Sequence, residues 1–458
     1  MATITFDRFD LGIDLRKGAS VSDANRLREM KNMYVTTGLS TAKRPGLSKI
    51  ATLPAGTTGL ASAFGRLQTF STGNIVLSNG LVNNNVLNAG GKTLKDIDFC
   101  DAFNAYLYVA ATFTDGTTKH FYNNQPVTDA NCPHTKACIR AASKMFAVSP
   151  DGDTVRFSKT GDPTVWTAAD DAGFLPTGLN ALGDRTTCAL GMYRTQIVSL
   201  SRDGCEVWKV DADPTAMALT DHVANVGTSF PRTVTNVGGD LYFLSDYGFR
   251  SIGMQAWSDN MIDVDVGSPI DSLVRQALKE RGSIEPKSFY FYGTGQYVCA
   301  LANRLFVYSV SKTAKINAWS QYLLSCPVDA VAQLGQDLYI RSGDDIYLFD
   351  SEAATDAGER YECYLEMPWM DFKRPGVLKM VYGMDIVCEG SCEVSLGFNA
   401  NNASASTPFI PVHGNTRPTG IIPVQCAGTE FSPRIYCYND EPFELEAITL
   451  YYNEMGYV

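Results

Sequence analysis

The chain has few of the residues that build most enzyme centres. Only 4 of its 458 residues are histidines, and they are spread over the chain as His120, His134, His222 and His413. No motif surrounds any of them, so we expect hydrogen-bonded or solvated loop histidines. No G-x-S-x-G, H-E-x-x-H or P-loop pattern occurs, which excludes the enzyme classes that depend on these motifs. We therefore expect a protein that is not an enzyme, with no catalytic residue, no metal and no cofactor.

The 12 cysteines do not form a metal-binding pattern. No C-x-x-C pair occurs, because five residues separate Cys132 from Cys138 and three separate Cys388 from Cys392. Structural zinc sites usually draw on closely spaced pairs, so this spacing argues against one. We expect most cysteines to be reduced, half-buried and apolar in behaviour. A disulfide between Cys388 and Cys392, across the turn that separates them, is the alternative.

Long hydrophobic runs are missing as well. No stretch approaches the roughly 18 consecutive apolar residues of a membrane span. The segment Met1–Asp14 carries charge without an apolar core, so no signal peptide is expected. The formal net charge is −11 at pH 7. An acidic surface repels nucleic acid, which argues against a protein that grips DNA but not against one that lets DNA slide past.

What the chain does contain is a recurring pattern of two strands joined by a tight polar turn. Alternating apolar residues on both sides of an Asp- or Gly-rich turn are typical of β-hairpins. Successive copies start roughly 40–50 residues apart, which is the spacing of propeller blades. Four copies are clear, at 145–157, 196–208, 240–252 and 337–350. Weaker copies cover 71–80, 105–122 and 296–308. Turns such as Asp151-Gly152-Asp153 could hold calcium, although Asp-Gly is already the preferred hairpin turn.

These patterns predict an all-β fold: a propeller-like repeat domain with an N-terminal arm and a C-terminal β-sandwich or barrel-like domain. The expected ranges are 1–54 for the arm and docking segment, 55–355 for the propeller-like domain and 356–458 for the C-terminal domain. A helical insertion is expected near 269–281, where 270–279 is amphipathic. The expected C-terminal strands are 361–365, 379–387, 392–398, 431–438 and 443–452. Five tryptophans are expected to pack between blades rather than stack on sugars: Trp166, Trp208, Trp257, Trp319 and Trp369.

The first 50 residues differ from the rest. The segment Ser22–Met33 is predicted to form a short helix, because Leu27, Met30 and Met33 recur every three residues and Ser22 or Asp23 could cap it. Such a short helix would have to dock on another part of the protein. An extended arm ending in the Pro45-Gly46 turn follows.

Both ends of the chain resemble one protein family. The stretches that carry the resemblance are Asp10-Leu11-Gly12-Ile13-Asp14-Leu15-Arg16, Asn25-Arg26-Leu27, Asn32-Met33-Tyr34, Lys43-Arg44-Pro45-Gly46-Leu47 and 365–372. They are similar to the tail nozzle proteins of short-tailed bacteriophages, of the tail tubular protein B and packaged-DNA stabilisation types. The most specific part is Asn-Met-Tyr followed after a short gap by Arg-Pro-Gly.

The resemblance implies a structural protein of the virion, assembled in the host cytoplasm. It implies a homo-oligomeric ring, usually of six subunits, that extends the DNA exit channel below the portal and adaptor and helps retain packaged DNA. Tail fibres or spikes would attach to the ring, and double-stranded DNA would pass without sequence-specific binding. The expected contacts with a neighbouring subunit or the adaptor are Asn32, Met33, Tyr34, Arg44, Pro45 and Gly46. The loops 83–92 and 400–408 are candidates for a gate by length and polarity, and the residues that face the channel are not evident.

Two other interpretations stay open. The propeller pattern, the aromatic residues and the acidic turns also suit a carbohydrate-binding or carbohydrate-cleaving receptor-binding protein, since paired carboxylates for glycoside hydrolysis leave no fixed sequence spacing. A cellular propeller that serves as a protein-interaction hub would explain the repeats, but not the two ends of the chain.

Overall fold

A computed structural model of the chain describes residues 2–77, 80–179, 186–255, 266–311 and 313–457. The chain folds into two compact units. Unit 1 comprises residues 1–49, 294–327 and 349–458, and unit 2 comprises residues 50–293 and 328–348. The segment 294–327, which the repeat pattern groups with the propeller-like domain, thus belongs to the same unit as the N-terminal segment. The two units are described separately below.

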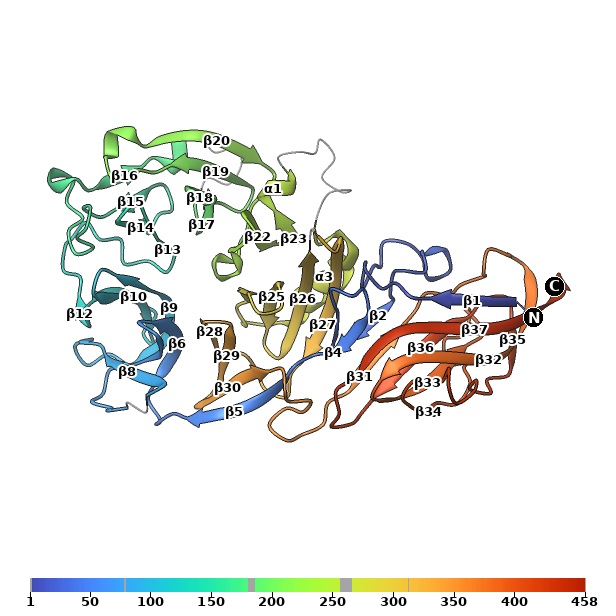
Figure 1. The fold of residues 1–458 in the computed structure, drawn as a ribbon. Helices are drawn as coiled ribbons and strands as arrows, with labels where there is room; N and C mark the ends of the chain where they lie inside the picture. Colours follow the sequence, from blue (N-terminus) through green and yellow to red (C-terminus); the bar gives the residue numbers. More distant parts are fainter. Residues whose placement is uncertain (1, 78–79, 180–185, 256–265, 312, 458) are drawn as a thin grey trace. The chain divides into compact units, whose positions relative to one another are not determined.

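Unit 2 consists mainly of small sheets of three or four strands. Its strands are β6 (Thr58–Ala63), β7 (Arg66–Ser71), β8 (Val82–Val86), β9 (Leu94–Phe103), β10 (Tyr106–Phe113), β11 (Thr118–Tyr122), β12 (Gln125–Pro126), β13 (Cys138–Ala141), β14 (Lys144–Val148), β15 (Val155–Phe157), β16 (Gly173–Leu175), β17 (Ala189–Tyr193), β18 (Gln196–Leu200), β19 (Gly204–Lys209), β20 (Ala218–Ala224), β21 (Thr235–Val237), β22 (Asp240–Ser245), β23 (Gly248–Ser251), β24 (Lys287–Phe291), β28 (Ala330–Leu334) and β29 (Asp337–Ser342). The strands β5 (Gly46–Thr52) and β30 (Asp345–Asp350) cross the boundaries between the units. The helices are α1 (Ile252–Gln255) and α3 (Asp271–Glu280), with short 3-10 turns at Ala168–Asp170, Thr177–Leu179, Pro214–Ala216, Pro231–Thr233 and Ser268–Ile270. Figure 1 shows the small sheets following one another in chain order around unit 2.

Four sheets of unit 2 bury both of their faces, one against each neighbouring sheet. In β10 the residues Leu107, Val109 and Ala111 belong to the core shared with the sheet β6-β7-β8. The intervening Tyr108 and Ala110 belong to the core shared with the sheet β13-β14-β15-β16. Because successive side chains of a strand point to opposite faces, one apolar strand supplies two cores. This explains why these strands are continuous apolar runs rather than a simple apolar–polar alternation.

The stack of sheets continues through unit 2, and its last sheet packs on its first. Further cores join the sheets of β13–β16 and β17–β20, and then those of β17–β20 and β21–β23. A last core joins Ala332, Tyr339 and Ile346 to Leu60 and Leu67, so that the sheet of β28–β30 packs on the first sheet. The fold of this unit is therefore propeller-like, as the repeat spacing predicts.

Most of the predicted hairpins are confirmed. β14–β15, β18–β19, β22–β23 and β29–β30 pair antiparallel, and so do β10–β11. In the Asp151 turn, Gly152 has φ +76° and the Asp151 carboxylate accepts the Asp153 N–H at 3.1 Å. The copy at 71–80 is wrong over its described residues, because only Ser71 lies in a strand and β7 pairs in parallel with β8 instead. The helix expected at 270–279 is confirmed as α3.

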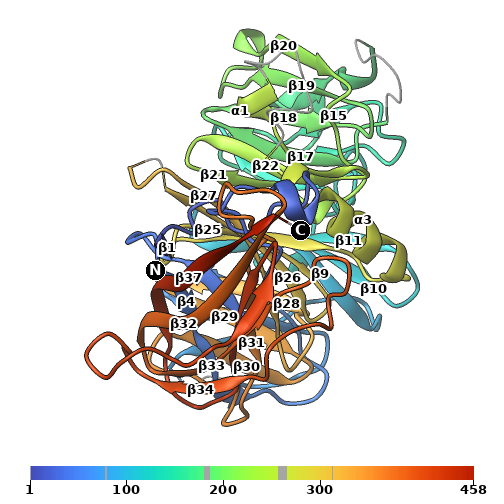
Figure 2. The same ribbon diagram turned by 90° about the vertical axis from the view of Figure 1, so that its right-hand side faces the viewer.

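Unit 1 contains two sheets. Its strands are β1 (Ala2–Phe6), β2 (Glu29–Lys31), β3 (Met33–Val35), β4 (Thr41–Lys43), β25 (Gln296–Leu301), β26 (Arg304–Ser311), β27 (Ile316–Leu323), β31 (Cys363–Glu366), β32 (Val377–Glu389), β33 (Ser391–Gly397), β34 (Ile410–His413), β35 (Cys426–Gly428), β36 (Ser432–Cys437) and β37 (Glu444–Tyr457), with a 3-10 turn at Ala19–Val21. One sheet has the order β3-β4-β37-β32-β35, with β1 also on β37, and the other contains β25-β26-β27-β2-β31-β36-β33-β34. Figure 2 shows the long strands β32 and β37, in orange and red, next to each other. All five predicted C-terminal strands are present, and they form the sandwich-like domain.

The predicted helix at Ser22–Met33 is wrong. Its last residues form β2 and the start of β3 instead, and Glu29, Met30 and Lys31 pair with β31. Asn32 lies between the two strands at φ +54°, a left-handed conformation that no α-helix contains. Leu27, Met30 and Met33 are fully buried, so the apolar positions were identified correctly while their period was misread.

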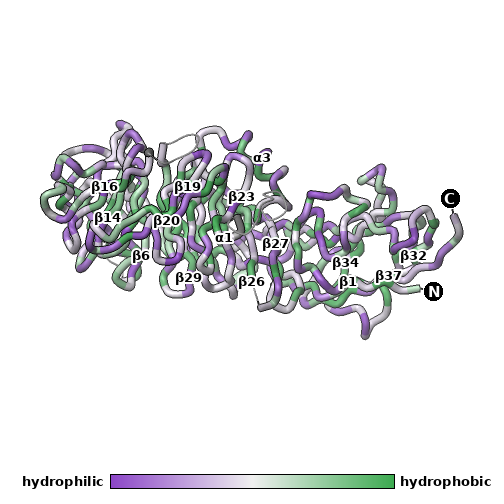
Figure 3. Tube along the Cα trace, turned by 90° about the horizontal axis from the view of Figure 1, so that it is seen from above, coloured by the Kyte–Doolittle hydropathy of each residue, from purple (hydrophilic) through white to green (hydrophobic). Residues whose placement is uncertain are grey.

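Figure 3 shows hydrophobic and hydrophilic residues interspersed along the trace. Within the described ranges, no helix combines the length and the apolar character that crossing a membrane requires. Four of the five tryptophans are buried as expected: Trp166, Trp208, Trp319 and Trp369. Trp257 lies outside the described residues.

Candidate functional site

The Arg-Pro-Gly segment predicted to contact another chain lies inside unit 1. Arg44 forms a two-pronged ion pair with Asp356, with Nη1–Oδ1 and Nη2–Oδ2 distances of 2.9 and 2.7 Å. Its Nε donates to Asn32 Oδ1 at 3.0 Å. The guanidinium carbon lies 3.8 Å from the centre of the Tyr361 ring, and the Tyr361 hydroxyl donates to the Arg44 carbonyl at 2.5 Å. One face of the guanidinium is thus covered by the Tyr361 ring, and its Nε, Nη1 and Nη2 atoms all donate hydrogen bonds.

This ion pair is completely shielded from water. The side chains of Arg44 and Asp356 are 0% and 1% exposed. Burial opposes the charge on Arg44, but the hydrogen bonds and charge of Asp356 outweigh it and raise the pKa of Arg44. Asn32 extends the network, because its side-chain amide donates to the Glu362 carbonyl at 2.6 Å and its Oδ1 accepts the Leu323 N–H at 2.7 Å. We call Asn32, Arg44, Asp356 and Tyr361 the Arg44 network.

Four of the predicted contact residues are buried within unit 1. Asn32, Met33 and Arg44 are 2% exposed or less, and Gly46 is buried. Within unit 1 these four residues make internal contacts, and their place at an interface with another chain stays a prediction. A Cβ on Gly46 would lie 2.2 Å from the Thr355 carbonyl oxygen, which explains why glycine follows Pro45. Tyr34 and Pro45 are half-buried, and their place at an interface stays a prediction.

A cavity of about 600 Å³ lies at the centre of the sheets of unit 2. It is lined by inner strands of successive sheets, including β6, β9, β13, β17, β24 and β28. Its charged lining residues are Asp96, Asp98, Lys136, Arg232, Glu285, Lys287 and Asp329. This is where a propeller concentrates side chains from all of its blades, so it is the second candidate site.

Arg232 connects separate parts of this lining. Its Nη1 lies 2.5 Å from Asp96 Oδ2 and its Nη2 lies 2.5 Å from Asp98 Oδ1. Arg232 Nη2 also donates to the Ile97 carbonyl at 3.2 Å. Lys287 Nζ lies 3.6 Å from Asp96 Oδ2, and Arg232 Nε lies 3.9 Å from Glu285 Oε2. The guanidinium therefore ties the segment before β21 to β9 across the ring of sheets.

The charge states in the cavity follow from burial and from this pairing. Burial raises the pKa of Asp98, although Arg232 and the Thr112 hydroxyl lower it in part. Burial lowers the pKa of Lys287 despite the nearby Asp96. Asp96 and Asp98 both form ion pairs with Arg232. These paired carboxylates are better suited to holding the inner strands together than to activating a nucleophile.

The two candidate gate loops differ in structure. Residues 83–86 are part of β8, so only 87–92 is a loop. Residues 399–404 are exposed, and Phe398 N and Ala405 O close this loop at 3.1 Å. A gating role for either segment stays a prediction.

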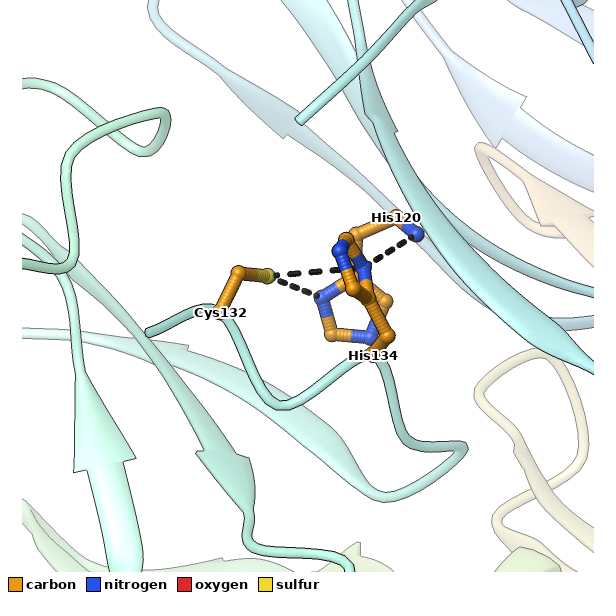
Figure 4. Close-up of side chains that lie close together, drawn as sticks. All are labelled: His120, Cys132 and His134. Carbon is orange, nitrogen blue, oxygen red and sulfur yellow. Dashed lines mark hydrogen bonds between the residues drawn. The ribbon is translucent and has the colours of Figure 1, made fainter. Parts of the chain in front are cut away.

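The structure brings together two histidines that the sequence appeared to keep apart. His120 lies on β11, and His134 lies with Cys132 in the segment between β12 and β13 (Figure 4). Cys132 Sγ lies 3.3 Å from His120 Nδ1 and 3.7 Å from His134 Nδ1. We call these three residues the His-Cys cluster. No sequence motif identifies this cluster, because His120 lies on β11 while Cys132 and His134 lie in the segment between β12 and β13.

All twelve cysteines are free thiols, Cys388 and Cys392 included. The thiols of Cys388 and Cys392 are joined by a hydrogen bond rather than a disulfide. The cysteines are free thiols as expected, but nine of them are buried rather than half-buried, and Cys100, Cys188 and Cys326 are half-buried.

Comparison with known proteins adds little beyond the fold. No protein-family model and no curated protein matches the chain. Among solved structures, the chain is similar to BamB from Moraxella catarrhalis, with 12% identity, a TM-score of 0.33, and coverage of 76% of this chain and 96% of BamB. It is also similar to an exo-β-1,3-galactanase from Phanerochaete chrysosporium, with 10% identity, a TM-score of 0.27, and coverage of 79% and 97%. At this level of similarity neither protein carries an argument about function.

Proposed function

We propose that the chain is a structural component of a bacteriophage tail, a nozzle subunit that extends the DNA exit channel below the portal and adaptor. Six copies would form the ring, help retain packaged DNA, and provide attachment for tail fibres or spikes. The ring would belong to the virion and be assembled in the host cytoplasm. Double-stranded DNA would pass through it without sequence-specific binding.

The observation that carries the proposal is that the two resembling ends of the chain form one body. Met30 on β2 pairs with Leu365 on β31, and Asn32 donates to the Glu362 carbonyl. The Arg44 network adds a buried ion pair that joins positions 312 residues apart. The stretches that carry the resemblance at the two ends therefore belong to the same unit, and residues next to them in the sequence pair with one another.

The electrostatics of the chain support the same proposal. A net charge of −11 disfavours sticking of DNA to the wall of a conduit. The cavity carboxylates Asp96 and Asp98 are paired internally with Arg232, as expected of a scaffold.

The test is electron microscopy of the full-length protein, alone and mixed with a candidate adaptor ring. Six-fold rings with a central channel, formed with the adaptor or without it, would support the proposal. Particles that stay monomeric in the presence of a correctly assembled adaptor would contradict it. Adaptor alone is the control, because its own ring must be distinguished from a mixed assembly.

The cavity in unit 2 is compatible with the alternative function, that of a carbohydrate-binding or carbohydrate-cleaving protein. Four carboxylates from three segments line it: Asp96, Asp98, Glu285 and Asp329. Binding to a host glycan, or shortening of a host polysaccharide, that is lost in Glu285→Gln would favour this alternative. No response in either assay would remove it.

A further inference from the structure

The His-Cys cluster has the chemistry of a metal site. His120 and Cys132 are buried, with 0% and 5% exposure, and His134 is half-buried. The two imidazole nitrogens and the sulfur lie within 4.8 Å of one another, and no other group of three such ligands within the described ranges does so. Thiolate and imidazole together are the ligands that zinc prefers.

The distances between the ligand atoms fit a tetrahedral ion. Bonds of about 2.3 Å to sulfur and about 2.05 Å to nitrogen, at the tetrahedral angle, place the two ligand atoms about 3.6 Å apart. The distances from Cys132 Sγ to the two Nδ1 atoms are 3.3 and 3.7 Å. The two sulfur–nitrogen distances are thus close to those of a tetrahedral site, and the three ligand atoms lie within 4.8 Å of one another.

Neighbouring groups orient the ligands as the surroundings of a metal site do. His120 Nε2 donates to the Thr135 carbonyl at 2.7 Å, which fixes the proton on Nε2 and leaves the Nδ1 lone pair facing Cys132. The Tyr108 hydroxyl lies 2.8 Å from the same Nδ1.

The backbone at His134 is bent towards the cluster. Its φ of +51° is left-handed, which is costly for a residue with a side chain and is often found at functional sites. In this conformation His134 Nδ1 accepts the His120 backbone N–H at 3.2 Å. A metal ion would take over that lone pair, so it competes with this hydrogen bond and also with the one that the Tyr108 hydroxyl donates to His120 Nδ1.

Cys138 does not complete the set of ligands. Its sulfur lies 3.4 Å from His120 Nε2, on the other edge of the ring, and 3.3 Å from the Thr135 carbonyl oxygen. The fourth position would fall to water. A zinc dication bound by one thiolate and two neutral imidazoles would have a net charge of +1. The nearby Asp129 carboxylate favours this positive charge, and Lys119, close to His134, disfavours it.

We propose that His120, Cys132 and His134 form a zinc-binding site that ties the segment before β13 to β11 in the second sheet of unit 2. Binding converts the Cys132 thiol to a zinc thiolate and releases its proton to solvent. The site is independent of the proposed tail function.

The experiment is cobalt and zinc titration of the full-length protein after chelator treatment and dialysis. Cobalt should give a sulfur-to-cobalt charge-transfer band and tetrahedral visible bands, and zinc should bleach them at close to one ion per chain. In Cys132→Ser the charge-transfer band should disappear, and in His134→Asn cobalt affinity should fall at least tenfold. Cys205→Ser, at a buried cysteine on β19, is the matched control and should behave as wild type.

Circular dichroism of each variant without metal shows whether it is folded, so that a loss of metal binding can be distinguished from a loss of folding. A wild-type protein that gives no charge-transfer band with cobalt would overturn the proposal and leave the cluster as a hydrogen-bonded part of the core. So would a band that persists unchanged in Cys132→Ser. If Cys132→Ser does not fold, the folded His134→Asn decides, because its affinity must fall while that of Cys205→Ser does not.

Discussion

Asp356→Asn should destabilise unit 1 far more than the same change at a surface ion pair. The substitution keeps the size of the side chain but leaves the Arg44 guanidinium charged and buried, with 0% exposure, and without its counter-ion. Removing one partner of a buried pair costs about 3–5 kcal/mol. For a body the size of unit 1 this corresponds to a fall in melting temperature of roughly 6–20 °C.

Asp440→Asn is the matched control, because Asp440 pairs with Arg360 at 3.1 Å while the two side chains are 58% and 50% exposed. Exposed pairs of this kind contribute about 1 kcal/mol or less. A protein with two units need not unfold in one step, so calorimetry should be combined with hydrogen exchange. We expect protection to fall in β3 and β4 and to be kept in β14 and β18.

Equal effects of Asp356→Asn and Asp440→Asn would refute the argument that burial makes the Arg44 pair important. A second measurement uses the double variant Arg44→Met/Asp356→Leu, which removes both charges. It should be more stable than Asp356→Asn, because an apolar replacement of a buried pair is often close to neutral whereas an uncompensated buried charge is not.

Two further predictions concern the cavity and the glycine after Pro45. Arg232→Met should cost unit 2 about 3 kcal/mol near pH 7, while Arg202→Met, at a side chain that is 60% exposed, should cost about 1 kcal/mol or less. Because the pKa of Asp98 is raised in the folded protein, its contribution to stability is largest at low pH and is lost as pH rises through the folded-state pKa. Removing Arg232 raises that pKa further, so the stability difference between Arg232→Met and wild type should shrink on acidification. A difference that grows on acidification would contradict the pairing of Arg232 with Asp98. Gly46→Ala should cost about 1–3 kcal/mol in denaturant unfolding, because its Cβ would meet backbone oxygens. Gly38→Ala is the control: its Cβ would lie 3.5 Å from Thr36 Oγ1, so it should cost no more than about 0.5 kcal/mol. Equal losses would show that the close approach at Gly46 is relieved.

The hairpins of unit 2 could be predicted because their signals are local. An Asp-Gly turn between two alternating runs, as at Asp151-Gly152, needs no information from elsewhere in the chain. The helix predicted at Ser22–Met33 failed because its apolar spacing also suits a strand, and pairing with β31, more than 300 residues later, decided between them. Asn32 at φ +54° ends any helical continuation, yet asparagine in a sequence does not announce that conformation.

The sites were harder to predict, because each depends on residues from distant segments. The sequence drew attention to Arg44, but its partner Asp356 has no motif that identifies it, so the buried ion pair could not be predicted. In the His-Cys cluster, the short Cys132-Pro133-His134 segment was the available signal, and its value depended on knowing that β11 places His120 opposite. Arg232 and its carboxylates became recognisable only once the sheets had brought their inner strands together.

The Arg44 network also bears on the order in which the protein is made. Arg44 leaves the ribosome 312 residues before Asp356, which at about 5–20 residues per second is a delay of roughly 15–60 s. During that interval the first 49 residues, although synthesised first, have none of their partners from 349–458, while the strands of unit 2 up to β23 have already emerged. The N-terminal segment should therefore be among the last parts of the chain to fold. In a chain released before residue 349, this segment would lack its C-terminal partners and stay exposed.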